Sequence, residues 1–298
     1  MKYNLAFKYR IYPNKDQELL INKTFGCVRF VYNKILYTAN KIYEETGKNK
    51  IITPASLKKE NQFLKEIDSL ALANAQLNVK RSFTNFFQKR AKFPRFKSKK
   101  NNVKSYTTNC VNNSIRIEEN KYLVLPKLKK VKLKYHREIP KDYKIKSVTL
   151  TNSNGNYYVS VLTEFEKEIQ KIPSNDKVIG LDFSMSELFV SSENQRADYP
   201  RYFRMLEKKL KKLQKSLSRK VKFSKNWYKQ KAKISKLHEY IKNCRRDFLH
   251  KLSKKLSKEH NAVIVEDLNM KGMSQALNFG KSVGDNGWGM FLRMLEYK

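Results

Sequence analysis

The sequence predicts a multidomain protein of the α+β class, and three changes in its apolar pattern predict it. Up to about residue 104, apolar residues recur mainly at the three- and four-residue spacing of amphipathic helices. From about 105 to 166 they alternate with polar residues, as in half-buried strands. Beyond about 175, apolar runs of strand length are separated by long helical patterns. We therefore expect a helical part, a small β-part and a C-terminal α/β part.

The helical part is expected to follow a single strand. Residues 3–12 alternate in polarity, which predicts an N-terminal strand. A helix is expected over 16–46, because apolar residues recur there at helical spacing until Gly47, a residue that commonly ends helices. A second helical stretch runs from about 53 to 90, with a break near Ser69.

Short alternating runs predict the strands of the β-part. The step Asn154-Gly155 between two such runs is typical of a tight hairpin turn. The polar, charged segment 164–176 carries Pro173 and is expected to be a linker. The expected strands are 114–117, 122–125, 131–135, 147–151 and 157–162.

The C-terminal part is expected to begin with a buried strand that ends at an acid. A second strand returns beside it as a hairpin, and two long basic helices lead to a third apolar strand that also ends in acid. The expected strands are 177–183, 187–191 and 262–268, the long helices lie within 203–221 and 227–256, and a last helix starts at about Gly287.

The charge of the chain indicates a polyanionic partner. It has 64 Lys and Arg against 27 Asp and Glu, a formal net charge of +37. Nucleic acid is the first candidate, because neutralised phosphates release condensed counterions, and an anionic membrane surface is the second. The sequence has no apolar stretch of about 18 residues that would span a membrane, and its N-terminus lacks the apolar core of a signal peptide. We expect an intracellular protein.

Basic and aromatic residues interleave in segment 80–104, which contains no acid. Lys and Arg bind phosphates and Phe stacks on unpaired bases, so this segment is a candidate nucleic-acid interface. The helical spacing of Phe83, Phe86 and Phe87 favours core positions for them. Segment 93–100 contains Pro94, which keeps it out of a helix, and for this segment we favour nucleic-acid contact over a merely solvated surface. The candidate contact residues are Lys80, Arg81, Lys89, Arg90, Lys92, Arg95, Phe96, Lys97, Lys99 and Lys100.

Segment 125–137 is also basic and free of acids. Phosphate contact and a solubilising surface remain alternatives for it. The three cysteines lie far apart, and none forms a C-x-x-C pair, so no zinc site is expected. The four histidines do not cluster at metal-ligand spacing either.

Asp182 and Glu266 are the candidate catalytic and metal-binding residues, because each ends an apolar strand. Hydrolysis of a phosphodiester by two divalent cations requires carboxylates at rigid positions, and strand ends are rigid. Asp182 would bridge both metals, and one of Glu266 and Asp267 would join it, since strand neighbours point to opposite faces. An acid after a strand is alternatively a turn or helix-cap residue, which is the expectation for Asp285 as N-cap of the last helix.

Five separated segments, in the same order, resemble the TnpB proteins. These proteins, also called OrfB transposases, are transposon-encoded RNA-guided nucleases related to the type V CRISPR effectors. Segment 179–186 (IGLDFSMS) resembles their first RuvC motif and 263–270 (VIVEDLNM) the second. The resemblance also covers 284–291 with 295–298, 25–33 and 93–99, and so spans essentially the whole chain.

The resemblance implies three domains and their partners. Residues 1–12 and 105–170 would form a wedge-like β-barrel domain, 13–104 a helical recognition domain, and 175–298 a RuvC, RNase H-like domain. Asp182 and Glu266 match the family's first two catalytic acids and would hold Mg²⁺. The partners would be a guide RNA and target double-stranded DNA, with base pairing supplying most of the specificity. A cytoplasmic, nucleoid-associated prokaryotic protein is implied.

The chain departs from the family at its end. In the family, a four-cysteine zinc ribbon and a third catalytic Asp follow the point where this sequence stops, so a C-terminally shortened member is expected. A nuclease-inactive RNA-guided DNA-binding protein or a transposon remnant is therefore the alternative function. A ribosome-type RNA-binding protein would fit the charge but gives no reason for the two acid-tipped strands. A cutting and joining transposase would need a complete acidic triad.

Overall fold

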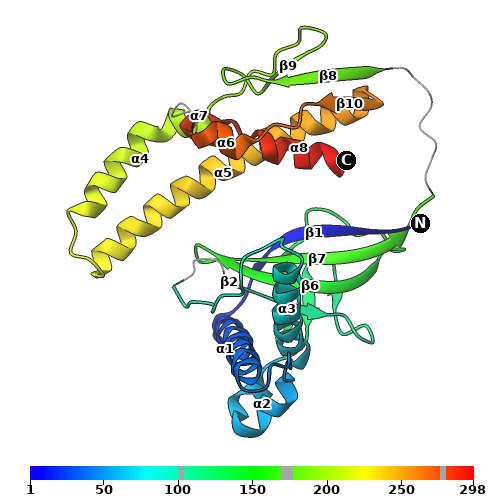
Figure 1. The fold of residues 1–298 in the computed structure, drawn as a ribbon, viewed down its shortest axis with the longest axis vertical. Coiled ribbons are helices and arrows are strands. Elements are labelled where there is room, and N and C mark those ends of the chain that lie inside the picture. Colours follow the sequence, from blue (N-terminus) through cyan, green and yellow to red (C-terminus); the bar gives the residue numbers. More distant parts are fainter. Residues whose placement is uncertain (101–103, 169–176, 276–279) are drawn as a thin grey trace. The chain divides into compact units, whose positions relative to one another are not determined.

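The computed structural model describes residues 1–298 apart from 101–103, 169–176 and 276–279. The chain forms two compact units, 1–169 and 170–298, each containing both helices and strands (Figure 1). The expected α+β class is confirmed at this level. Most of the expected linker lies outside the described residues. None of the described helices is long and apolar enough to cross a membrane.

A seven-stranded antiparallel sheet forms the base of the first unit. Its order is β2-β6-β7-β1-β5-β4-β3, so the N-terminal strand lies near the middle, between β7 and β5. The Asn154-Gly155 hairpin joins β6 to β7, with Gly155 in the left-handed conformation that the turn requires. The strands are β1 (Lys2–Tyr12), β2 (Lys104–Asn109), β3 (Arg116–Glu118), β4 (Tyr122–Leu125), β5 (Lys129–Lys134), β6 (Lys144–Ser153) and β7 (Asn156–Glu166).

The helices of this unit share one core with the sheet. α1 (Lys15–Thr46) starts at a capping box formed by Asn14 and Gln17 and ends at Gly47, which is left-handed. The stretch expected over 53–90 is broken into α2 (Pro54–Glu60), a 3₁₀ turn, η1 (Gln62–Glu66), and α3 (Ser69–Phe87). Apolar side chains of α1, α3 and the strands form a continuous buried cluster, which fixes the position of the C-terminal end of α3.

The second unit contains a three-stranded sheet of order β10-β8-β9. β8 (Val178–Phe183) lies in the centre, antiparallel to β9 (Phe189–Ser191) and parallel to β10 (Ala262–Val265). The second strand begins at Phe189, two residues later than expected, because Glu187 belongs to the turn. The parallel pairing needs a long crossover, which the helices between β9 and β10 supply.

Two long helices form an antiparallel hairpin in that crossover (Figure 1). They are α4 (Tyr202–Ser218) and α5 (Lys225–Glu259), and their shared core contains Leu210, Leu237 and Ile241. α4 ends earlier than expected, at Ser218, so Val221 lies in the turn. The last part of the chain forms α6 (Met270–Gln275), α7 (Gly280–Asn286) and α8 (Trp288–Glu296). Trp288 and Phe291 of α8 pack into the core beneath β8 and β9.

Candidate functional site

Asp182 and Glu266 stand at the ends of neighbouring strands in the second unit. β8 and β10 run parallel, and their last paired residues are Leu181 and Val265. One step further lie Asp182, still in β8, and Glu266, directly after β10. Facing residues of parallel neighbours point to the same side, and adjacent strands are about 4.8 Å apart. This register therefore places both acids at one edge of the sheet, on the same side.

The same register distinguishes Glu266 from Asp267. Ile179 and Leu181 are buried in the core, whereas Asp182 is exposed on the other face of β8. Successive residues of an extended chain alternate between faces. Glu266 and Asp267 are both exposed, and alternation continued past Val265 would put Glu266, rather than Asp267, on the side of Asp182. Across the described ranges, no group of three or more His, Cys, Asp or Glu side chains could hold a metal ion.

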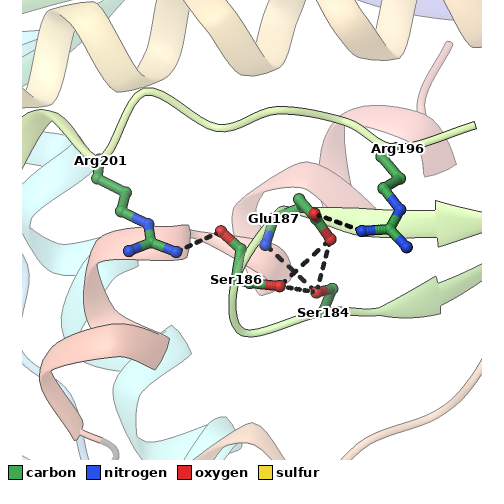
Figure 2. Close-up of polar contacts among 5 residues, drawn as sticks. All are labelled: Ser184, Ser186, Glu187, Arg196 and Arg201. Atoms are coloured by element: carbon green, nitrogen blue, oxygen red, sulfur yellow. Dashed lines mark hydrogen bonds and ion pairs between the residues drawn. The ribbon is translucent and has the colours of Figure 1, made fainter.

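A network of polar contacts holds the turn that follows Asp182 (Figure 2). The Glu187 carboxylate accepts hydrogen bonds from the Ser184 and Ser186 hydroxyls at 3.2 and 3.3 Å and forms an ion pair with Arg196 at 3.3 Å. Arg201 donates to the Ser186 carbonyl oxygen at 2.7 Å. The turn is therefore fixed by its own side chains and by two arginines that follow it in the sequence. Sequence reasoning missed Glu187 because it placed that residue in a strand.

The stretch before α8 ties this turn to the long helices. Asp285 is buried and accepts from the backbone N–H groups of Phe203 and Arg204, at 3.2 and 3.3 Å, in the first turn of α4. It also forms an ion pair with Arg245 of α5 at 3.1 Å. Asn286 donates from Nδ2 to two carbonyl oxygens of the turn after β8, those of Ser184 and Glu187.

The expectation that Asp285 caps the last helix is therefore wrong. Gly287 is the N-cap residue of α8, and Asp285 caps α4 instead. Its local sequence could not show this, because the capped helix starts more than 80 residues earlier. Gly287 is left-handed, and a Cβ there would meet the Arg245 side chain at 3.1 Å, so glycine fits this close approach.

The candidate contact residues of segment 80–100 form an exposed basic surface in the first unit. All ten, from Lys80 to Lys100, are exposed, and none of their cations has an acid partner among the described residues. Two hydrogen bonds hold the segment on α1, one from the Lys97 N–H to Asn33 Oδ1 at 2.8 Å and one from Asn33 Nδ2 to the Lys97 carbonyl at 3.0 Å. The Lys97 ammonium lies 4.2 Å from the Tyr32 ring centre, and partial burial lowers its pKa.

Aromatic rings accompany these cations. Phe83 is buried, as expected, but Phe87 is 66% exposed, so the expected core position of Phe87 is wrong. Phe93 lies 5.9 Å from the Phe83 ring and 5.2 Å from the Phe86 ring and is half exposed. Phe96 is 57% exposed. The segment thus presents aromatic faces and positive charge together.

Comparison with known proteins places the chain in a family. InsQ of Escherichia coli (strain K12), named as a candidate RNA-guided DNA endonuclease, is 34% identical over 324 residues, covering 100% of this chain and 78% of InsQ. A Streptomyces pristinaespiralis protein with the same description is 32% identical over 302 residues, covering 98% of this chain and 74% of that protein. The chain belongs to the OrfB_IS605 family. The resemblance to OrfB and TnpB proteins seen in the sequence is confirmed.

Two family models match separate ranges of this OrfB-family chain. The model described as "Probable transposase" matches residues 159–277, a range that includes β8, the α4–α5 hairpin and β10, and with them Asp182 and Glu266. The model described as "Helix-turn-helix domain" matches residues 1–48. Those residues fold as strand β1 followed by the single helix α1, so the described motif is not formed within them.

The fold of this OrfB protein also occurs in a solved structure. The protein chain in a cryo-EM structure of the Cas12f1-sgRNA-target DNA complex matches it with a TM-score of 0.58 and 10% sequence identity. The match covers 99% of this chain and 88% of that chain. At this identity, the likeness concerns the fold.

Proposed function

We propose that this OrfB-family chain is an RNA-guided DNA endonuclease whose RuvC-type core uses Asp182 and Glu266. The observation that carries the proposal is the placement of these two acids at adjacent ends of parallel strands, on one side of the sheet. The names of the two relatives, and the sgRNA and target DNA in the Cas12f1 complex, support the guided activity. The net charge of +37 fits a protein that binds both RNA and DNA.

The two carboxylates fit a divalent metal site. Mg²⁺ prefers oxygen ligands and keeps several waters, so two exposed acids from neighbouring strands suit it. When bound there, the metal would activate a water and stabilise the oxygen that leaves the phosphodiester. Asp182 and Glu266 would hold and orient this centre, and the Glu187 network would keep the adjoining turn fixed while a strand of DNA is positioned.

We propose domain roles on the same grounds. Residues 1–12 and 105–170 would serve as a wedge-like β-domain, 13–104 as the recognition domain and 175–298 as the RuvC core. The guide RNA and the target duplex would be the partners, and the basic surface of segment 80–100 would neutralise phosphates of the guide or of its hybrid with DNA. Exposed cations on rigid elements position the backbone, and base pairing supplies the sequence.

One observation favours a second function. The described residues contain no group of three or more His, Cys, Asp or Glu side chains that could hold a metal ion. A guided protein that occupies DNA without cutting it would need no such group. This alternative keeps the same partners and the same basic surface.

A plasmid cleavage assay tests the proposal. The chain is co-expressed with RNA from its own locus, purified with that RNA, and incubated with a plasmid library and Mg²⁺, beside Asp182→Asn. Guided cutting that Asp182→Asn abolishes supports the endonuclease. Retention of RNA and matched DNA without cutting supports the guided binder, and retention of neither would contradict both functions.

A further inference from the structure

The turn between α4 and α5 presents a compact group of three aromatic rings, two of them exposed. Phe223 is 64% exposed and Tyr228 is 54% exposed. Trp227 lies between them, with ring centres 5.6 Å from Phe223 and 5.1 Å from Tyr228. We call these three residues the hairpin tip. Large apolar side chains gathered at the end of a projecting element are costly in water unless a partner covers them.

The charged residues in the sequence around the hairpin tip are all basic. Residues 208–238 contain 13 Lys and Arg and no acid. Lys222 lies 5.3 Å from the centre of the Phe223 ring, and Lys231 lies 5.0 Å from the Trp227 ring. A purely apolar partner would leave these cations unmatched, and a merely acidic surface would match the charge but leave the aromatic rings uncovered. Nucleic acid offers both matching groups, because its phosphates pair with the lysines and arginines and its flat bases can stack on the aromatic rings.

The hairpin tip is held in shape before any partner arrives. The Ser224 hydroxyl caps α5 by accepting from the Trp227 N–H at 3.1 Å. Gln230 is buried, and its Nε2 donates to the Leu213 carbonyl oxygen of α4 at 3.0 Å, which ties the two helices close to the turn. Phe223 has a left-handed backbone (φ 70°), which a bulky residue rarely adopts. A fixed aromatic surface loses little conformational entropy on binding.

We propose that the hairpin tip binds unpaired bases of a nucleic-acid strand by stacking, while the lysines around it bind the flanking phosphates. The proposal rests on the proposed function only in naming nucleic acid as the partner. Duplexes keep their bases stacked on one another, so the tip would prefer loops, bulges and single strands. The guide RNA and a displaced DNA strand offer the same chemistry, and the test separates them.

The test uses the full chain and measures unguided binding, so its outcome is independent of cleavage. The variant Phe223→Ala/Tyr228→Ala removes two exposed rings. Its matched control is Met205→Ala/Tyr240→Ala, which removes side chains that are 70% and 59% exposed from the same hairpin, away from the tip. Circular dichroism of both variants checks that the helices remain folded.

Dissociation constants are measured for a labelled 12-nucleotide single strand, as RNA and as DNA, and for a blunt duplex of the same sequence. We expect the tip variant to bind single strands about tenfold or more weakly, since a stacked base is worth about 1–3 kcal/mol, with the duplex unchanged and the control like wild type. If the tip variant loses affinity for RNA alone, the guide RNA is the strand that the tip binds. If it loses affinity for DNA equally, the displaced DNA strand is a ligand as well. No loss relative to the control, or an equal loss on the duplex, would overturn the proposal.

Discussion

Replacing Asp285 is expected to lower the free energy of unfolding of the second unit by much more than the loss of an exposed acid would. Its carboxylate is buried, pairs with Arg245 and caps two backbone N–H groups of α4. The side chains of this ion pair are 3% and 19% exposed. Asp285→Ala would leave Arg245 largely buried without its acid partner, which typically costs about 3–5 kcal/mol. The lost cap of α4 would add a smaller cost, about 0.5–2 kcal/mol.

The chain supplies its own probe for this prediction. Both tryptophans, Trp227 and Trp288, lie in the second unit, and Trp288 is 1% exposed. Urea unfolding followed by tryptophan fluorescence therefore reports this unit within the full chain. With a slope of about 2 kcal/mol per molar urea, a loss of about 3 kcal/mol lowers the midpoint by about 1.5 M.

Two further variants test the reasoning. Asp285→Asn keeps an oxygen acceptor for α4 but loses the charge, so we expect an intermediate midpoint. Asp247→Ala is the matched control, because it breaks an ion pair in the same unit whose side chains are 64% and 76% exposed, and its midpoint should stay near that of the wild type. If Asp285→Ala shifts the midpoint no more than Asp247→Ala, the assigned role of Asp285 is wrong.

Three other predictions concern pH, salt and one anchor. Burial, with Lys298 and Arg246 nearby, lowers the pKa of His250 from its usual 6.5. The folded unit therefore favours the neutral form of His250. The stability that His250 contributes is fully present above about pH 6.5 and is lost as the pH falls through the lower folded-state pKa. Thermal melts of His250→Gln should lack this pH dependence. Arg81→Gln/Arg90→Gln/Arg95→Gln should reduce the slope of log K against log salt for RNA by about 2 to 3, and an unchanged slope would exclude phosphate contact. Asn33→Ala should speed tryptic cleavage within 89–100, because it removes both hydrogen bonds to Lys97. Equal rates would show that these two hydrogen bonds do not hold the segment.

The sequence predicted most of the elements because their patterns are local, but β2 (Lys104–Asn109) was not among the expected strands. Strand 122–125 and the helix ended by Gly47 match the structure closely, since alternation and a left-handed glycine act within a few residues. The positions of Asp182 and Glu266 after apolar strands were visible in the same way. The sequence analysis joined them in one metal site, but the parallel register that pairs β8 with β10, strands more than 80 residues apart, is not written in either local pattern.

What the sequence could not show depends on long-range contacts. Asp285 reads locally as a cap of the next helix, but its partners come from α4 and α5. Phe87 follows the spacing of a core residue, yet α3 ends there and the ring lies at the surface. Glu187 reads as a strand residue, although its carboxylate is drawn into the turn by Ser184 and Arg196. In each case a tertiary contact overrides the local pattern.

The most direct test of the central claim compares two adjacent acids in the guided cleavage assay. Continued past Val265, the register of β8 and β10 would put Glu266, and not Asp267, on the side of Asp182. Glu266→Gln should abolish cutting of a matched plasmid while leaving RNA and DNA binding intact, and Asp267→Asn should cut at the rate of the wild type. Loss of cutting in Asp267→Asn with retention in Glu266→Gln would contradict the assigned site.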